Sequence, residues 1–343
     1  MAKRKSSTRR VPKMAPAITD LLFTADVANQ GDSRSYIDTA KELSKVNRRL
    51  YEQGRMYAYQ GLTFIWRQSN DGADPPVPID IQTIEVSVKT AGNTWIVHNA
   101  FVKGKALWDE MQDLVLDDNP SIRGKWHDYK LTLSSSQTNA RLLAVKDGSG
   151  NDVIGGDWDL AKYVMPQHNV AVAGDGSGIP PGEPLPAEEF SASLIGGDAA
   201  TRRSLVKAYQ ESRSTVQPVD PNVPAGMSTS FFNLLTDSGS QEPELADIIE
   251  DENDVPPYAV DDYPGGDVNA TSPFTVGYAA VSVAEVDGRV GPFIAPCGLL
   301  EVQIKGYKSD GNEVALADMP AIDILLHVAP GMYKGVAAIP MGQ

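Results

Sequence analysis

The chain has 343 residues, of which 41% are hydrophobic and 22% are charged, and its formal net charge is −15. This length can bury one large core or two modest ones, and the composition excludes collagen-like, coiled-coil and wholly disordered chains. No apolar run approaches the roughly 18 to 20 residues that cross a bilayer, and no apolar segment follows the charged start as in a secretory signal. These features predict a soluble protein that does not use a membrane.

The positive charge is concentrated at the N-terminus. Six cations and no acid lie in the first 13 residues: Lys3, Arg4, Lys5, Arg9, Arg10 and Lys13. Subtracting their charge from −15 leaves −21 on the remaining 330 residues. A short basic arm cannot bury enough apolar surface to fold alone, so we expect it to stay flexible and bind a polyanion. The alternatives are a nuclear-localisation signal, which is compatible with binding, and a solubilising tail.

An amphipathic helix is predicted directly after the arm. Residues 14–33 are expected to form a linker, so that the arm and linker together span residues 1–33. From Ser33 to Leu50 the apolar residues recur at helical spacing, and Gly54 is a plausible stop. The opposite face carries four cations: Lys41, Lys45, Arg48 and Arg49. This face is either a solvated surface or a second contact with nucleic acid.

Strands dominate the rest of the chain. Runs of β-branched and aromatic residues with partial alternation predict strands at 56–67, 79–89, 94–102, 129–133, 274–286, 299–307, 322–328 and 334–340. Helical spacing predicts helices at 103–116, 202–213 and 242–252. Because strands and helices do not alternate regularly, we expect residues 34–343 to form one body. That body is predicted to be a mainly β, antiparallel sandwich with helical and loop insertions.

No catalytic or cofactor-binding pattern is visible. The four histidines lack metal-ligand spacing, and the single cysteine, Cys297, has apolar neighbours that indicate a buried thiol. The glycines of 170–178 are followed by two prolines, which exclude the helix that a phosphate loop needs. We therefore expect no enzyme and no cofactor. A β-sandwich hydrolase using Asp117, Asp118 or Asp157 is the alternative from that class.

Two acidic segments could bind structural calcium. Asp147, Ser149, Asn151 and Asp152 alternate as in a calcium loop but lack its glycine and distal glutamate, which favours a hairpin turn. The acids between Asp247 and Asp254 could bridge subunits through calcium, although such a run is more often a solvated helix end. We therefore expect no metal other than a possible structural calcium ion, and we assign no residue as a metal ligand.

A further segment mixes cations with aromatic rings. Arg123, Lys125 and Trp126 are followed by Tyr129 and Lys130. Rings that stack on bases and cations that meet phosphates suit single-stranded nucleic acid. The same residues equally suit a strand that buries Trp126 and exposes its charges.

Several segments resemble a known protein family. The stretches at 47–67, 94–130, 162–170, 220–235, 244–266 and 291–301, among them NRRLYEQGRMYAYQGLTFIWR and GPFIAPCGLLE, look like capsid proteins of small circular Rep-encoding single-stranded DNA viruses. The resemblance implies a single jelly roll that assembles into an icosahedral homo-oligomer. The basic arm would then lie inside the shell on the single-stranded DNA genome.

The expected function follows from the arm and this resemblance. We expect a viral capsid protein that packages single-stranded DNA electrostatically, located in the virion and, during assembly, in the host nucleus or cytoplasm. Its partners would be further copies of itself and the genome, with no small-molecule substrate. The alternative is a single-stranded nucleic-acid-binding protein of a phage or cell that forms no shell.

Overall fold

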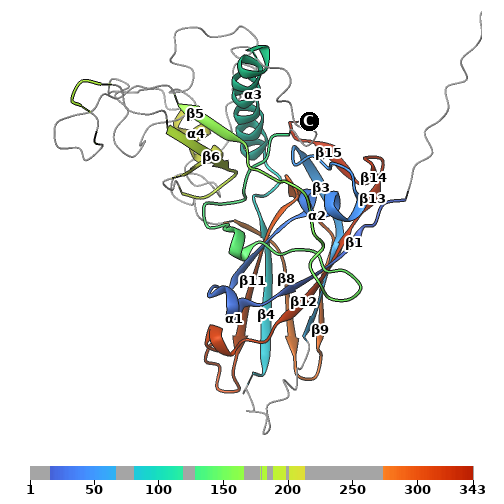
Figure 1. Ribbon diagram of the computed structural model, residues 1–343. Coiled ribbons are helices and arrows are strands. Elements are labelled where there is room, and N and C mark those ends of the chain that lie inside the picture. Colours follow the sequence, from blue (N-terminus) through green and yellow to red (C-terminus); the bar gives the residue numbers. More distant parts are fainter. Residues whose placement is uncertain are drawn as a thin grey trace, which may run out of the picture.

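The computed structural model describes residues 16–66, 81–118, 128–165, 178, 180–183, 188–197, 201–212 and 273–342 (Figure 1). The fold is mainly β, and its two larger sheets are antiparallel throughout. Among the helices of these residues, none is both long enough and apolar enough to span a bilayer.

The larger sheet is built around the long strand β3 (Arg55–Trp66). Its order is β1 (Asp20–Ala25), β12 (Ile322–Val328), β3 and β10 (Phe293–Pro296), and β3 also pairs with β9 (Asp287–Val290) and β15 (Ala338–Pro340). In β1 the alternate residues Leu21, Phe23 and Ala25 are fully buried. This period of two is what places one face of a strand in a core.

The smaller sheet covers the same core from the other side. Its order is β2 (Arg34–Asp38), β11 (Leu299–Tyr307), β4 (Thr83–Thr90) and β8 (Phe274–Ser282). Val86 and Val302 of this sheet share one hydrophobic cluster with Phe64 and Ile324 of the larger sheet. The two sheets therefore pack face to face, as in a β-sandwich.

A second lobe is inserted between β4 and β8. It contains α3 (Trp95–Asp118), α4 (Leu205–Ser212) and a small sheet of β5 (Lys162–Met165), β6 (Glu188–Ser193) and β7 (Arg202–Ser204), in which β6 and β7 are parallel. A separate core that includes Tyr129, Tyr163 and Leu205 holds it together. In Figure 1 this helical lobe stands at the top of the sandwich.

The remaining described elements are short. They are α1 (Val27–Gln30), α2 (Thr39–Asn47), the 3-10 helices η2 (Asn139–Arg141) and η3 (Leu316–Asp318), and the hairpin of β13 (Pro330–Gly331) and β14 (Gly335–Val336). Of these, α2 and the hairpin matter most for the candidate site.

Several predicted elements require correction. The linker prediction for 14–33 is wrong for the part that forms β1 and α1, because β1 pairs with β12 along its whole length. The helix predicted from Ser33 begins only at Thr39, since residues 34–38 pair with β11. The strand predicted at 94–102 is the start of α3, and Ile96, Val97, Ala100 and Phe101 are buried at helical spacing. The predicted strand at 129–133 makes an isolated bridge from Thr132 to Ser193.

Candidate nucleic-acid interface

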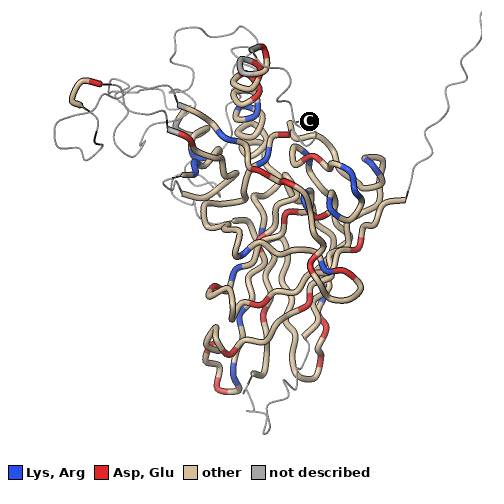
Figure 2. The backbone as a smooth tube through the Cα atoms, in the orientation of Figure 1, with Lys and Arg blue, Asp and Glu red and all other residues tan. Residues whose placement is uncertain are grey.

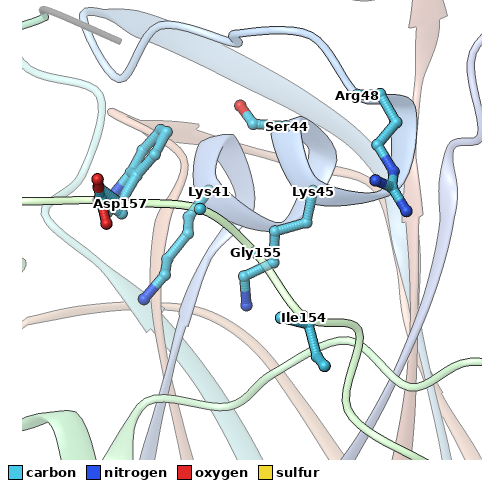
Figure 3. A pocket seen from close by; sticks show the side chains of 9 residues that line it. Lys41, Ser44, Lys45, Arg48, Ile154, Gly155 and Asp157 are labelled. Carbon is cyan, nitrogen blue, oxygen red and sulfur yellow. The ribbon is translucent and has the colours of Figure 1, made fainter. Parts of the chain in front are cut away.

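The helix α2 presents a row of cations beside a hollow. Asp38 caps its first turn by accepting a hydrogen bond from the backbone N–H of Lys41 at 3.0 Å, and Ala40 and Leu43 are buried in the sandwich core. Figure 3 shows Lys41, Lys45 and Arg48 leaving α2 above the 154–158 segment, with which they line a hollow of about 180 Å³. Lys41 and Lys45 lie on α2 as predicted, whereas Arg48 and Arg49 follow the end of the helix, so the predicted face is only partly a helix face.

The cations of α2 do not have equal roles. The Nζ atom of Lys45 lies 2.8 and 3.0 Å from the two carboxylate oxygens of Glu42. Glu42 is fully buried, and its Oε2 also accepts a hydrogen bond from the N–H of Val145 at 3.0 Å. The charge of Lys45 thus compensates a buried acid. Among the described residues, Lys41, Arg48 and Arg49 form no ion pair.

The chain that follows the basic arm is attached to the C-terminal end of α2. The N–H of Ile18 donates to Oδ1 of Asn47 at 2.8 Å, and Nδ2 of Asn47 donates to the carbonyl of Ile18 at 3.0 Å. Asn47 is the last residue of α2, and Arg48 follows it in the left-handed conformation with φ 54°. The arm therefore joins the body within a few residues of Arg48 and Arg49.

Two further cations complete a group around this junction. Arg55 begins β3, and its guanidinium carbon lies 3.7 Å from the ring centroid of Tyr333, while Nζ of Lys334 lies 4.9 Å from the same centroid. Both cations contact the carboxylate of Glu52, at 3.1 and 3.5 Å.

We call Arg48, Arg49, Arg55 and Lys334 the arm-base cluster. Arg55 and Lys334 share the single negative charge of Glu52, which leaves a net positive charge on the cluster. In Figure 2, Lys and Arg lie near α2 and the β13–β14 hairpin, and further ones lie on the helical lobe and along the sandwich. The exposed acids Glu285, Asp287, Asp310 and Glu313 lie at the other end of the sandwich, where the exposed cations Arg289 and Lys308 also lie.

Sequence reasoning missed Arg55 and Lys334. Arg55 follows Arg49 closely in the sequence, so the density of arginines at 48–55 was a usable signal. Lys334 is far away in sequence, and it reaches the cluster because β15, which follows the hairpin, pairs with the start of β3. Its Nζ then donates to the carbonyl of Leu50 at 2.6 Å.

The other predicted contact residues lie outside the described part of the chain. They are Lys3, Arg4, Lys5, Arg9, Arg10 and Lys13 of the arm, and Arg123, Lys125 and Trp126 of the mixed segment. Tyr129 and Lys130, which follow that segment, are buried. The hydroxyl of Tyr129 lies 2.5 Å from that of Tyr163, and the Nζ atom of Lys130 lies 4.9 Å from the ring centroid of Trp158. Tyr129 and Lys130 therefore make contacts in the interior of the protein.

The possible calcium loop is a hairpin turn. Oδ1 of Asp147 accepts hydrogen bonds from the N–H groups of Ser149 and Asn151 at 2.8 and 2.9 Å. These bonds lower the pKa of Asp147, with the bond from Asn151 making the largest contribution. Asp152 instead pairs with Lys146 at 2.6 Å. The acids of 247–254 lie outside the described residues, and the residues that are described contain no group of three side chains suited to hold a metal ion.

The structure also places the histidine, cysteine and aspartate residues that were weighed as possible catalytic or metal-binding groups. Nδ1 of His98 accepts a hydrogen bond from the backbone N–H of Gly342 at 3.0 Å, and Nε2 donates one to Oδ1 of Asn93 at 2.9 Å. Cys297 is fully buried, and burial raises the pKa of its thiol well above the usual value. Asp117 lies in the last turn of α3, whereas Asp157 lies in the segment facing α2.

No family model, no curated protein and no solved structure matches the chain. The resemblance to capsid proteins therefore stays a prediction, and the function is inferred from the residues and fold of this chain.

Proposed function

We propose that this chain is the capsid protein of a small single-stranded DNA virus, a jelly roll that assembles into an icosahedral shell. Strand order is the observation that carries the proposal. If β9 and β10 count as one strand and the short β15 beside β3 is set aside, the sandwich has eight strands in chain order. The larger sheet then has the order 1-8-3-6 and the smaller sheet 2-7-4-5. This order supports a jelly roll, a fold used by many viral capsids.

The fold alone does not set the function, because jelly rolls also occur in lectins and cupins. The charge distribution supports packaging. The six cations of residues 1–13 precede the first strand of the sandwich. The described chain begins close to the arm-base cluster, where Ile18 bonds Asn47, so the arm and the folded cations could act on one strand of nucleic acid. The acidic remainder repels phosphate and confines binding to that side.

Assembly would turn weak contacts into strong ones. One arm with six cations is expected to give a salt slope of roughly −4 for a single strand, which is a weak, salt-sensitive interaction. Many arms inside one shell raise the effective concentration of the next contact. The proposed partners are copies of this chain and single-stranded DNA, the proposed location is the virion, and no catalytic step is proposed.

The size of the purified full chain tests this proposal. Light scattering and negative-stain microscopy, across a range of salt and calcium concentrations, should show closed particles of uniform diameter. Monomers or dimers under every condition, with binding to single-stranded DNA retained, would instead establish the protein that binds single strands without forming a shell.

A further inference from the structure

A hollow lies between α2 of the sandwich and residues 154–158, the segment that leads into the helical lobe (Figure 3). Its volume is about 180 Å³, whereas pockets for whole drug-sized ligands measure roughly 300 to 1,000 Å³. A hollow of this size therefore receives one unit of a larger ligand and not several units at once. We call it the α2 hollow.

Two cations of the α2 hollow are available to a ligand. Lys41 and Arg48 line it, and neither forms an ion pair with a residue that the structure describes. In Figure 3 their side chains leave α2 on either side of Lys45, which pairs with buried Glu42 at 2.8 Å and so adds no net charge. A phosphate between the two free cations would meet the point charge of a lysine and the planar donors of an arginine.

Glycine keeps the wall that faces α2 open. Gly155 and Gly156 line the hollow, and their backbone N–H groups donate to no acceptor in the described part of the chain. A Cβ atom on Gly155 would lie 2.8 Å from both Cγ and Cε of Lys45. Any larger residue at position 155 would therefore displace that lysine and take up space in the hollow.

An apolar side chain lies on the same wall. Ile154 is 89% exposed and lines the hollow together with the cations of α2. A single exposed isoleucine is ordinary on a protein surface, but this one faces Lys41 and Arg48 across an open space (Figure 3). That combination suits a ligand in which an anionic group is joined to an apolar ring, as it is in a nucleotide.

One carboxylate opposes an anion in the hollow. Asp157 lines the end away from Arg48 (Figure 3) and forms no ion pair with the residues described. Lys41 and Arg48 outweigh its charge, so the lining keeps a net positive charge once the pair of Lys45 and Glu42 is set aside. A phosphate is therefore expected closer to Arg48 than to Asp157.

We propose that the α2 hollow binds one nucleotide of the bound single strand, with its phosphate between Lys41 and Arg48 and its sugar or base against Ile154. This inference rests on the proposed function, because the nucleotide belongs to the strand that the protein would package. It adds a fixed point of contact on the folded body that does not depend on the basic arm. Inorganic phosphate shares the charge of a nucleotide but not its apolar surface, so the two ligands can be distinguished.

Lysine acylation of the full chain, read residue by residue by mass spectrometry, tests the proposal. The reaction is run at constant ionic strength with increasing thymidine 5′-monophosphate, inorganic phosphate or thymidine. We expect the monophosphate to protect Lys41 at a concentration about fivefold lower than inorganic phosphate, because apolar contact adds to charge. Exposed Lys308, at the other end of the sandwich, is the internal control. Protection of Lys41 that is no greater than that of Lys308, or no better with the monophosphate than with phosphate, overturns the proposal.

Two substitutions should give changes of opposite sign. Asp157→Asn removes the opposing carboxylate, so protection of Lys41 should need about threefold less monophosphate. Ile154→Ser should abolish the advantage of the monophosphate and leave protection by inorganic phosphate unchanged. Glu285→Gln, which removes an exposed carboxylate at the other end of the sandwich, is the matched control. Asp157→Asn that gains no more than this control contradicts the proposal, and if a variant does not fold, the three ligands on the unaltered chain decide.

Particle size separates failure of this inference from failure of the proposed function. Closed particles in which Lys41 is not protected would overturn the nucleotide site and leave the capsid standing. Protection of Lys41 in a chain that stays monomeric or dimeric under every condition would overturn the capsid and support the nucleotide site on a protein that binds single strands.

Discussion

At the scale of single residues, Lys45 and Lys41 show that neighbouring cations on one helix can have different functions. Lys45 lies against buried Glu42, whereas Lys41 forms no ion pair with the described residues. Removing one partner of a buried pair leaves an uncompensated charge, which costs far more than losing a solvated one. The sequence places Lys45 three residues after Glu42, a spacing at which helix side chains can pair, but it does not show that Glu42 is buried.

Lys45→Met should therefore lower the free energy of unfolding by about 3 kcal/mol, and Lys41→Met by less than about 0.5 kcal/mol. Urea denaturation at pH 7 measures both. In binding to single-stranded DNA the order should reverse, with the larger loss in Lys41→Met. Equal stability losses in the two variants would show that Lys45 does not compensate Glu42.

Gly298 is a second position at which the structure restricts the residue, through its backbone conformation and through the space around it. It lies between β10 and β11 with φ 66°, and a Cβ atom there would approach Cδ2 of Tyr57 to 2.9 Å and Cβ of Thr39 to 3.2 Å. The left-handed conformation and this crowding act together, because both neighbours are buried.

Gly298→Ala should cost about 2 to 3 kcal/mol of unfolding free energy, the sum of backbone strain and overpacking. Gly311→Ala is the matched control, because Gly311 has φ 83° but a Cβ atom added there would meet no atom within 4 Å. That control should cost only about 1 kcal/mol. Thermal unfolding of both variants measures the difference, and a Gly298→Ala cost no larger than that of the control would refute the crowding.

At the scale of elements, the arm-base cluster gives the clearest prediction. Arg48 and Arg49 follow α2, make no ion pair among the described residues and lie beside the attachment of the arm. Replacing both with Gln should reduce the magnitude of the salt slope for a single-stranded oligonucleotide by about 1.4. The control is Lys308→Gln, an exposed cation near the acidic turns. A slope unchanged by the double substitution would remove these residues from the interface.

Strand prediction succeeds where alternation and burial agree. The predicted ranges 299–307 and 322–328 match β11 and β12, and the prediction for 56–67 differs from β3 by one residue at each end. Prediction fails at 94–102, where β-branched residues favour a strand locally but the buried positions repeat every three to four residues into α3. It also fails at 34–38, where pairing with β11 overrides a helical pattern.

The candidate site was predictable only in part. Lys41 and Lys45 follow from local spacing, because both lie on one face of α2, whereas Arg48 and Arg49 lie beyond its end. The position of the arm beside Arg48 depends on the hydrogen bonds between Ile18 and Asn47, and the position of Lys334 depends on strand pairing. Such contacts join residues that no local pattern connects.

At the scale of the whole molecule, the attachment of the basic arm and the arm-base cluster lie at the same end of the sandwich. The chain that leads out of the arm, α2 and the arm-base cluster lie together, while exposed acids lie at the opposite end of the sandwich with Arg289 and Lys308 (Figure 2). A shell built from such subunits could place the arm and the arm-base cluster on one surface. We expect that surface to face the genome, because phosphate is attracted to it and repelled by the remainder.

The content of purified particles tests this account most directly. Full-length protein and a variant lacking residues 1–13 are expressed in parallel, treated with nuclease and purified as particles. We expect closed shells from both, with nuclease-protected DNA at least about tenfold lower in the variant, because six phosphate contacts per subunit are lost. Equal amounts of protected DNA in the two preparations would contradict it.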